Sequence, residues 1–355
     1  MPNVLSPALL VWIAVTAVLM PSILFLRALL HYASVHKLVP LPALADPDCM
    51  VVMPARNEQR NIARAVRSFP PDTVIVVDDG STDSTAAEAS KAGAGVLPAP
   101  PLPKGATGKS NACAAGAAVL SSRWILFADA DTWYEPEFFR AAIGCAEANN
   151  LDFLSILLTP APQGLAEHVL TPYAQALFFA GVNPKVHAQA AFCGQCMLVR
   201  SNAYRFIGGH GALLTYLAAD VKLAALAERH RLKFALIRAG ALGHMRFQEG
   251  YAGLQEGVER SAFRFMLVPS WLGTSIVLTA AMAALWVPAA ALLVKSGYTW
   301  AYALALLPML WSAGWYRSWR VVLAPLAVYA ILPLLWTGVT SAMTGARVDW
   351  KGRTI

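Results

Sequence analysis

Short apolar segments alternate with helical segments through the middle of this chain, and this alternation constrains its fold most strongly. The apolar segments have the length and the β-branched or aromatic content of buried strands. They cover residues 49–53, 73–77, 124–128 and 151–157. Helical patterns lie between or after them and end near Ser68, Lys91, Leu120 and Glu147, with Asn57 as the expected cap of the first. The alternation predicts a mainly parallel sheet with helices on both faces.

Acidic residues directly follow two of the predicted strands. Asp78 and Asp79 follow the second strand, and Asp129 and Asp131 follow the third. The carboxyl ends of parallel strands meet at one edge of a sheet, where ligands bind in open α/β folds. Carboxylates there suit a hard divalent cation, which usually brings phosphates with it. The pair Asp129 and Asp131 alone also fits an acidic turn, and the acids on the neighbouring strand favour the metal site.

Long apolar segments flank the predicted sheet. The chain is 57% hydrophobic and 14% charged, a composition typical of membrane proteins. Residues 5–30 contain one charged residue, Arg27, and are long enough to span about 30 Å of hydrocarbon. Further candidate spans cover residues 267–294, 298–316 and 321–343. We therefore predict an N-terminal anchor and linker at 1–44, an α/β domain at 45–262 and a C-terminal transmembrane region at 263–355.

Positive charge borders these apolar segments unevenly. The formal net charge is +7, and basic residues follow the first span and precede the second, whereas none precedes the first. The positive-inside rule therefore predicts a multi-pass protein of the cell inner membrane, with its α/β domain in the cytoplasm. Three C-terminal spans would place the basic tail on the other side, so the number of spans stays open. The basic residues are not interleaved with aromatic residues on a soluble face, so no nucleic acid partner is expected.

The five cysteines are scattered through the sequence and odd in number, which does not indicate a disulfide framework. Cys193 and Cys196 form a C-x-x-C pair. A structural zinc site would need a second such pair, which the sequence lacks.

Four short motifs resemble those of family 2 glycosyltransferases, which have the GT-A fold. They read V-V-M-P-A-R-N-E at 51–58, V-V-D-D-G-S-T-D at 76–83, G-K-S-N-A at 108–112 and F-A-D-A-D-T at 127–132. Their order and spacing are specific in combination, and the resemblance covers about residues 48–265. The segment 102–110, the Gly194–Gln195 turn and W-K-G-R at 350–353 are most similar to membrane lipid glycosyltransferases of the carotenoid (diaponeurosporenoate) and hopanoid-associated types. The resemblance implies an α/β GT-A domain, Rossmann-like and mainly parallel, joined to transmembrane α-helices.

The resemblance also implies a site for a nucleotide diphosphate sugar, with UDP-glucose as the first candidate. Pro54, Ala55 and Glu58 would surround the nucleotide, and Asp79 would accept hydrogen bonds from its base or ribose. Lys109, at a predicted helix N-terminus, would meet phosphate, because its charge and the helix dipole act together there. An ordinary solvated lysine is the alternative for that residue.

The same resemblance assigns the metal and the sugar contacts. Asp129 and Asp131 would hold the ribose and Mg²⁺ or Mn²⁺, which neutralises the diphosphate leaving group. Arg246 would grip the diphosphate, with an ordinary interfacial arginine as the alternative. Gly194 and Gln195 would contact the sugar or the acceptor.

Asp220 is the expected catalytic base. Inverting transfer needs a carboxylate opposite the leaving group to take the proton of the acceptor hydroxyl. In the family two adjacent acids begin a helix at this position, and here Ala219 stands in place of the first. A helix N-cap is the alternative role for Asp220. His210 would lie near the acceptor or serve as a structural histidine.

Together these features imply metal-dependent, inverting transfer of a single sugar to a membrane lipid. A carotenoid or another isoprenoid is the first acceptor to consider, and polyprenyl phosphate or a ceramide-like lipid is the alternative. The Q-x-x-R-W motif of processive polysaccharide synthases is absent. A non-catalytic membrane protein with a degenerate domain is the alternative from another class. It predicts lost carboxylates, whereas Asp79, Asp129, Asp131 and Asp220 are all present.

Overall fold

The computed structural model describes two compact units of this chain. The described residues are 7–39, 48–181, 192–216, 219–246, 250–251, 253–255 and 285–300, with short runs between 302 and 354. Unit 1 comprises residues 1–34, 162–183 and 247–348. Unit 2 comprises residues 35–161, 184–246 and 349–355.

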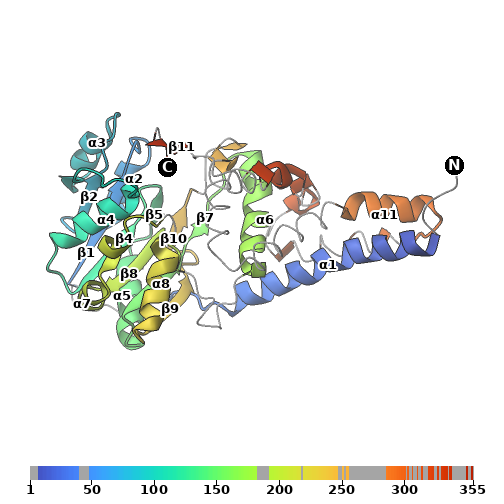
Figure 1. The fold of residues 1–355 in the computed structure, drawn as a ribbon, viewed down its shortest axis with the longest axis horizontal. Helices are drawn as coiled ribbons and strands as arrows, with labels where there is room; N and C mark the ends of the chain where they lie inside the picture. The colour runs from blue at the N-terminus through green and yellow to red at the C-terminus, as the bar shows by residue number, and fades with distance from the viewer. Residues whose placement is uncertain are drawn as a thin grey trace. The chain divides into compact units, whose positions relative to one another are not determined.

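Unit 2 is built on a seven-stranded sheet in the order β3-β2-β1-β4-β8-β6-β9 (Figure 1). Its strands are β1 (Cys49–Ala55), β2 (Val74–Asp78), β3 (Gly95–Pro98), β4 (Trp124–Ala128), β6 (Phe153–Leu157), β8 (Cys196–Arg200) and β9 (Phe234–Arg238). Strand β8 runs antiparallel between β4 and β6, and the other neighbouring pairs are parallel. The predicted mainly parallel α/β sheet is therefore confirmed.

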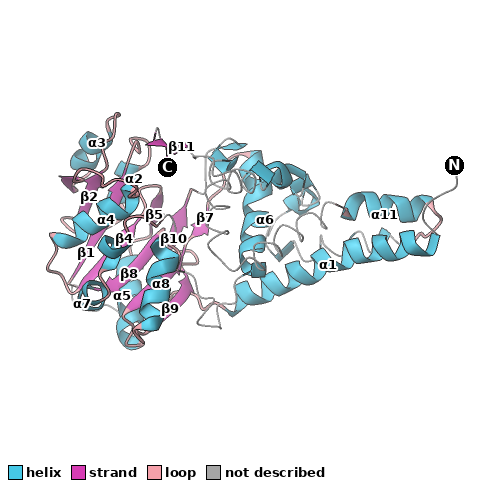
Figure 2. Ribbon diagram, viewed as in Figure 1, coloured by secondary structure: helices cyan, strands magenta, loops and turns pink. Residues whose placement is uncertain are grey.

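Helices lie between the strands of unit 2 in sequence and pack on its sheet (Figure 2). They are α2 (Ile62–Arg67), α3 (Thr85–Lys91), α4 (Gly108–Ala118), α5 (Phe138–Ala148), α7 (Ser201–Phe206), the 3₁₀ helix η2 (Gly209–Leu213) and α8 (Ala219–Arg229). One core contains Val52 and Ile125 of the sheet with Leu223 of α8. The alternate strand residues Val51 and Leu126 point to the other face and are equally buried. Both faces of the sheet are therefore covered.

A small three-stranded sheet begins directly after Asp131. Its strands are β5 (Thr132–Tyr134), β10 (Gly243–Met245) and β7 (Thr159–Pro160), in the order β5-β10-β7. Tyr134 packs against Phe69 and Phe138, with ring centroids 4.7 and 4.3 Å away. A final hairpin pairs β11 (Asp349–Trp350) with β12 (Arg353–Thr354). The aromatic contacts of Tyr134 fix the direction in which the chain leaves the acidic motif.

One local expectation was wrong, and one strand was missed. Asn57 does not cap the first helix of unit 2, which begins at Ile62 after Asn61. Asn57 instead adopts a left-handed conformation, with φ of 53°, and its side chain accepts a hydrogen bond from Thr82 N. Strand β3 lies in a stretch for which the sequence predicted no element. The side chain of Asn57 therefore joins two loops, and does not start a helix.

Unit 1 contains α1 (Pro7–Ser34), α6 (Leu165–Gly181), α11 (Trp286–Lys295) and the 3₁₀ helix η3 (Trp319–Leu323). Helices α1 and α6 pack through edge-on ring contacts, Phe25 with Tyr173 at 5.3 Å and Tyr32 with Phe179 at 5.4 Å. Among the residues described here, no helix combines the length and the apolarity needed to cross a membrane. Much of the predicted spans at 267–294, 298–316 and 321–343 lies outside the described residues.

Candidate functional site

Hydrogen bonds join the loop after β1 to the loop after β2. Glu58 N donates to Thr85 Oγ1 at 2.7 Å, and Arg56 Nη1 donates to the carbonyl oxygen of Asp79 at 2.6 Å. Asp79 N donates to the carbonyl oxygen of Ala55 at 2.9 Å. The predicted nucleotide contacts, including Pro54 on β1, therefore gather at the carboxyl ends of β1 and β2. Sequence reasoning missed Arg56, although its position inside the motif at 51–58 was a signal for it.

The carboxylate of Asp79 belongs to this group and is buried, with a relative exposure of 5%. Glu58 lies across the loop, where its Oε2 accepts a hydrogen bond from Asn61 Nδ2 at 2.9 Å. A carboxylate at each strand end leaves acceptors for the N–H groups and hydroxyls of a nucleoside.

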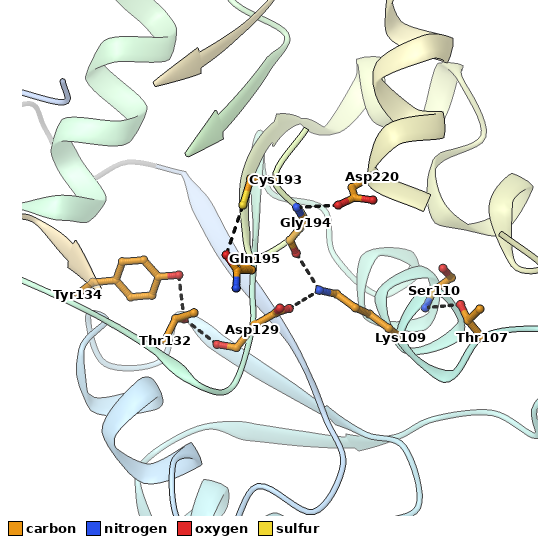
Figure 3. Close-up of polar contacts among 10 residues, drawn as sticks. All are labelled: Thr107, Lys109, Ser110, Asp129, Thr132, Tyr134, Cys193, Gly194, Gln195 and Asp220. Atoms are coloured by element: carbon orange, nitrogen blue, oxygen red, sulfur yellow. Dashed lines mark hydrogen bonds and ion pairs between the residues drawn. The ribbon is translucent and has the colours of Figure 1, made fainter. Parts of the chain in front are cut away.

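Lys109 forms an ion pair with Asp129 across the edge of the sheet (Figure 3). Its Nζ lies 2.5 Å from Asp129 Oδ1 and donates to the carbonyl oxygen of Gly194 at 2.8 Å. Burial is the largest single influence and would lower the pKa of Lys109, but the charge and hydrogen bond of Asp129, with smaller contributions from Cys113 and Asp220, together raise that pKa above its usual value. Lys109 therefore stays a cation beside the acidic motif. Its predicted contact with phosphate remains a prediction.

Gly194 connects Lys109 to Asp220 (Figure 3). The N–H of Gly194 donates to Asp220 Oδ2 at 3.0 Å, while its carbonyl oxygen accepts from Lys109. Asp220 lies in the first turn of α8 with a relative exposure of 7%, and its Oδ1 also accepts from Val221 N at 3.0 Å. One hydrogen-bonded chain thus runs from Asp129 through Lys109 and Gly194 to Asp220. The sequence predicted all four residues but not the contacts between them.

The remaining predicted residues border this chain. Gln195 accepts a hydrogen bond from Asp129 N through its carbonyl oxygen at 3.0 Å. Thr132 Oγ1 donates to the carbonyl oxygen of Asp129 at 2.6 Å, which closes the turn of the acidic motif. Arg246 N donates to the carbonyl oxygen of Asp131 at 3.1 Å. Both carboxylates of the motif are therefore placed by backbone contacts from elements far away in the sequence.

The acidic motif has the chemistry of a site for Mg²⁺ or Mn²⁺. It offers carboxylate oxygens from Asp129 and Asp131, and the described residues contain no group of three or more acidic, histidine or cysteine side chains that could hold a metal by themselves. Mg²⁺ is commonly bound by one or two carboxylates together with substrate phosphates and water. The residues present therefore fit a cation that arrives with a diphosphate.

His210 lies under the site in the core. It is buried, its Nδ1 lies 2.8 Å from the hydroxyl of Tyr204, and its ring meets Phe127 edge-on at 4.8 Å. Burial and the nearby cation of Lys109 lower the pKa of His210 to about 3. The ring is therefore neutral at physiological pH. These contacts favour the structural role, and the acceptor role remains a prediction.

A stack of three side chains on the small sheet was missed by the sequence analysis. Arg64 lies over the ring of Trp133, 3.6 Å from its centroid, and Trp133 stacks on His244 at 5.6 Å. Burial and the nearby cation of Arg246 lower the pKa of Arg64 from its usual value. The only signal in the sequence was an arginine at a helical position after the first motif.

Comparison with known proteins gives consistent results. Residues 50–206 match the sequence profile described as Glycosyl transferase family 2. A 4,4'-diaponeurosporenoate glycosyltransferase of Staphylococcus aureus strain MRSA252 is 28% identical over 224 residues, which is 58% of each chain. Its counterpart in strain USA300 is 38% identical over 89 residues, 24% of each chain. The match thus spans less than two thirds of either relative.

The fold also has a counterpart among solved structures. A mannosyltransferase of Pyrobaculum calidifontis, determined with GDP-Man and Mn²⁺, aligns with a TM-score of 0.59 at 16% identity, over 95% of this chain and 100% of that one. At 16% identity this similarity supports only the assignment of the fold. The sequence profile covers residues 50–206, which contain Lys109, Asp129 and Gly194, so this part of the chain carries a glycosyl transferase family 2 domain.

Proposed function

We propose that this protein transfers a single sugar from a nucleotide diphosphate sugar to a membrane lipid, with inversion at the anomeric carbon. The observation that carries the proposal is the hydrogen-bonded chain from Asp129 through Lys109 and Gly194 to Asp220. It holds a carboxylate suited to the donor and a carboxylate suited to the acceptor in one fixed arrangement. UDP-glucose is the first donor to test, and a carotenoid or other isoprenoid is the first acceptor. Polyprenyl phosphate or a ceramide-like lipid is the second.

The donor would bind at the carboxyl ends of β1, β2 and β4. Asp79 and Glu58 would accept hydrogen bonds from the base and ribose, against the backbone of Pro54 and Ala55. Lys109, in the first turn of α4, would bind a phosphate oxygen together with the N–H groups of that helix terminus. Asp129 and Asp131 would hold Mg²⁺ or Mn²⁺, which would supply Lewis-acid stabilisation of the departing diphosphate.

Asp220 would act as the general base in the transfer step. An acceptor hydroxyl gives its proton to Asp220 while its oxygen forms a bond to the anomeric carbon. The bond from that carbon to the diphosphate oxygen breaks, and the nucleoside diphosphate leaves with the electron pair. Gly194 N–H holds the Asp220 carboxylate in place for this step. Gln195 and Arg246 would orient the sugar and the diphosphate.

The lipid acceptor is supported by two separate observations. The curated relatives are named as glycosyltransferases of 4,4'-diaponeurosporenoate. The apolar segments at 5–30 and 267–343 are of the kind that places a protein in a bilayer. We place the protein in the inner membrane with unit 2 in the cytoplasm, where nucleotide sugars are available to it.

Incubation of the purified protein with Mn²⁺, labelled UDP-glucose or GDP-mannose and a lipid extract tests the proposal. A lipid that carries one labelled sugar, identified by its mass, is the expected product. Asp220→Asn should abolish product formation and leave nucleotide binding intact, whereas Asp131→Ala should weaken binding of the donor with Mn²⁺. A polymeric product, or full activity in Asp220→Asn, would contradict the mechanism.

A further inference from the structure

The guanidinium of Arg64 is held over an aromatic platform on the small sheet. It lies 3.6 Å from the ring centroid of Trp133, on β5, and Trp133 is paired with His244 on β10. The two rings stack with an interplanar angle of 22°. A planar cation on such a stack keeps its edge, with its N–H donors, available to a ligand. The arrangement therefore fixes the orientation of the guanidinium without using its hydrogen-bonding capacity.

Arg64 has no acidic partner within the described part of the chain. Throughout the described segments, no carboxylate or carbonyl oxygen lies within hydrogen-bonding or ion-pair distance of its guanidinium. Glu135, the acid next to the stack, lies instead 3.9 Å from His244 Nε2. A guanidinium that is oriented by stacking and has no carboxylate of the described residues beside it is suited to bind an anionic ligand.

The register of the small sheet places this cation beside the acidic motif. Trp133 pairs with His244, and the pairing continues from Arg246 N to the carbonyl oxygen of Asp131. Trp133 and His244 share one face of this sheet, while Asp131 directly precedes β5 and Arg246 directly follows β10. Arg64 covers the same face from α2. An anion bound there would also be close to a cation held by Asp131.

Three cations lie close to the acidic motif: Lys109 pairs with Asp129, Arg246 is hydrogen-bonded to the backbone of Asp131, and Arg64 lies near Arg246. A nucleotide diphosphate sugar brings two negative charges to them. When the glycosidic bond breaks, the diphosphate gains one further charge. A guanidinium oriented in advance stabilises that charge without a cost of reorganisation.

We propose that Arg64, supported by Trp133, is an oxyanion-binding residue that together with Arg246 receives the diphosphate of the donor. This inference rests on the proposed function and adds a residue and an aromatic support to its donor site. The bidentate geometry of a guanidinium suits a pair of phosphate oxygens. The site would take diphosphates in preference to nucleosides, because its contacts are made to the phosphate oxygens.

Calorimetric titration of the full-length protein with UDP and with GDP, each in Mn²⁺ and in EDTA, tests the proposal. Arg64→Met, which keeps an apolar stem on Trp133, should weaken nucleoside diphosphate binding about tenfold or more in both conditions. Arg64→Lys keeps the positive charge but loses the paired N–H donors of the guanidinium. Its affinity for the nucleoside diphosphates should lie between those of the wild type and Arg64→Met. Trp133→Leu should weaken binding and Trp133→Phe should largely preserve it. Uridine and guanosine should bind equally to all variants.

Arg67→Met is the matched control, because Arg67 lies on the same helix and is exposed. It should bind both diphosphates like the wild type. Diphosphate affinities unchanged in Arg64→Met would overturn the proposal. If instead only inhibition by oleate, a carboxylate lipid, is weakened, the anion belongs to the acceptor and the donor assignment is wrong. If the wild type binds UDP or GDP but transfers no sugar, the proposed function is contradicted, whereas the assignment of Arg64 to diphosphate binding is not.

Discussion

Gly194 is the residue whose substitution tests the arrangement of the site most directly. A Cβ at this position would lie 2.8 Å from Asp220 Oδ2 and 3.2 Å from Asp220 Cγ. Gly194→Ala should therefore displace the carboxylate and lower kcat by roughly 10- to 100-fold, because misplacing a reacting group by about 1 Å can have that effect. The KM for the donor should change little, since the carbonyl oxygen that binds Lys109 is kept. Steady-state kinetics with the labelled donor measure this separation.

Gly211→Ala provides the control, because a Cβ at Gly211 meets no atom within 4 Å. Its kcat should match that of the wild type. If Gly194→Ala also keeps its full kcat, the position of Asp220 does not limit the transfer step.

His210 predicts how stability depends on pH. Its pKa is about 3 in the folded protein, against an ordinary value of about 6.5. Between these two values the unfolded chain binds a proton that the folded chain does not. The stabilisation is therefore complete above about pH 6.5 and is lost as the pH falls toward 3. Thermal unfolding in detergent should show a steeper loss between pH 6.5 and 4.5 in the wild type than in His210→Gln.

Because His210 binds a single proton, its titration can change the free energy of unfolding by at most about 1.4 kcal/mol per pH unit. Parallel unfolding curves of the two proteins across this range would show that His210 is charged in the folded state. It would then be available to an acceptor.

At the residue scale, the sequence identified the chemistry but not the partners. The carboxylates Asp129 and Asp220 were predicted from motifs, because each motif is local in the sequence. The ion pair of Asp129 with Lys109 and the stack of Arg64 on Trp133 join residues that lie far apart along the chain. Such contacts depend on the sheet register, which one sequence does not reveal.

Gly116 allows helix α4 to lie very close to the seven-stranded sheet. A Cβ at Gly116 would lie 2.5 Å from Val52 Cγ1 and 2.9 Å from Val77 Cγ2. Gly116→Ala should therefore destabilise unit 2 by about 1–3 kcal/mol through overpacking. The helix propensity of alanine offsets at most about 1 kcal/mol of this. Thermal or chemical unfolding of the variant measures the balance.

A double-mutant cycle with Val52→Ala identifies the cause. Val52→Ala removes the methyl groups that the new Cβ would meet, so Gly116→Ala should cost less in that background. Strictly additive effects would mean that the helix shifts as a whole. The contact with Val52 would then not be the cause of the destabilisation by Gly116→Ala.

At the scale of elements, short local patterns predicted the strands well. Strand β4 has the predicted bounds, and β1, β2 and β6 agree within two residues. Strand β8 was not predicted, and the apolar residues 196–199 would not have indicated its antiparallel direction. The small sheet was missed because β7 is only two residues long and β5 three. Strands of that length have no periodicity to detect.

The whole molecule is expected to be an integral membrane protein. After cell fractionation, the full chain should sediment with membranes and resist extraction by alkaline carbonate, because the apolar segments at 5–30 and 267–343 would lie in hydrocarbon. A peripheral protein of the same cells serves as the control and should be released. Recovery of this protein in the carbonate supernatant would contradict the predicted anchors.

The place of β8 in the sheet also sets the order in which the domain can be completed during synthesis. Strands β1 to β4 come from residues 49–128 and pair with one another, so this half can assemble early. Among the described strands, β6 pairs with β8 and β9, both of which the ribosome makes later. We therefore expect β6 to stay unpaired in the emerging polypeptide until β8 is made, and an unpaired strand edge favours aggregation and chaperone binding.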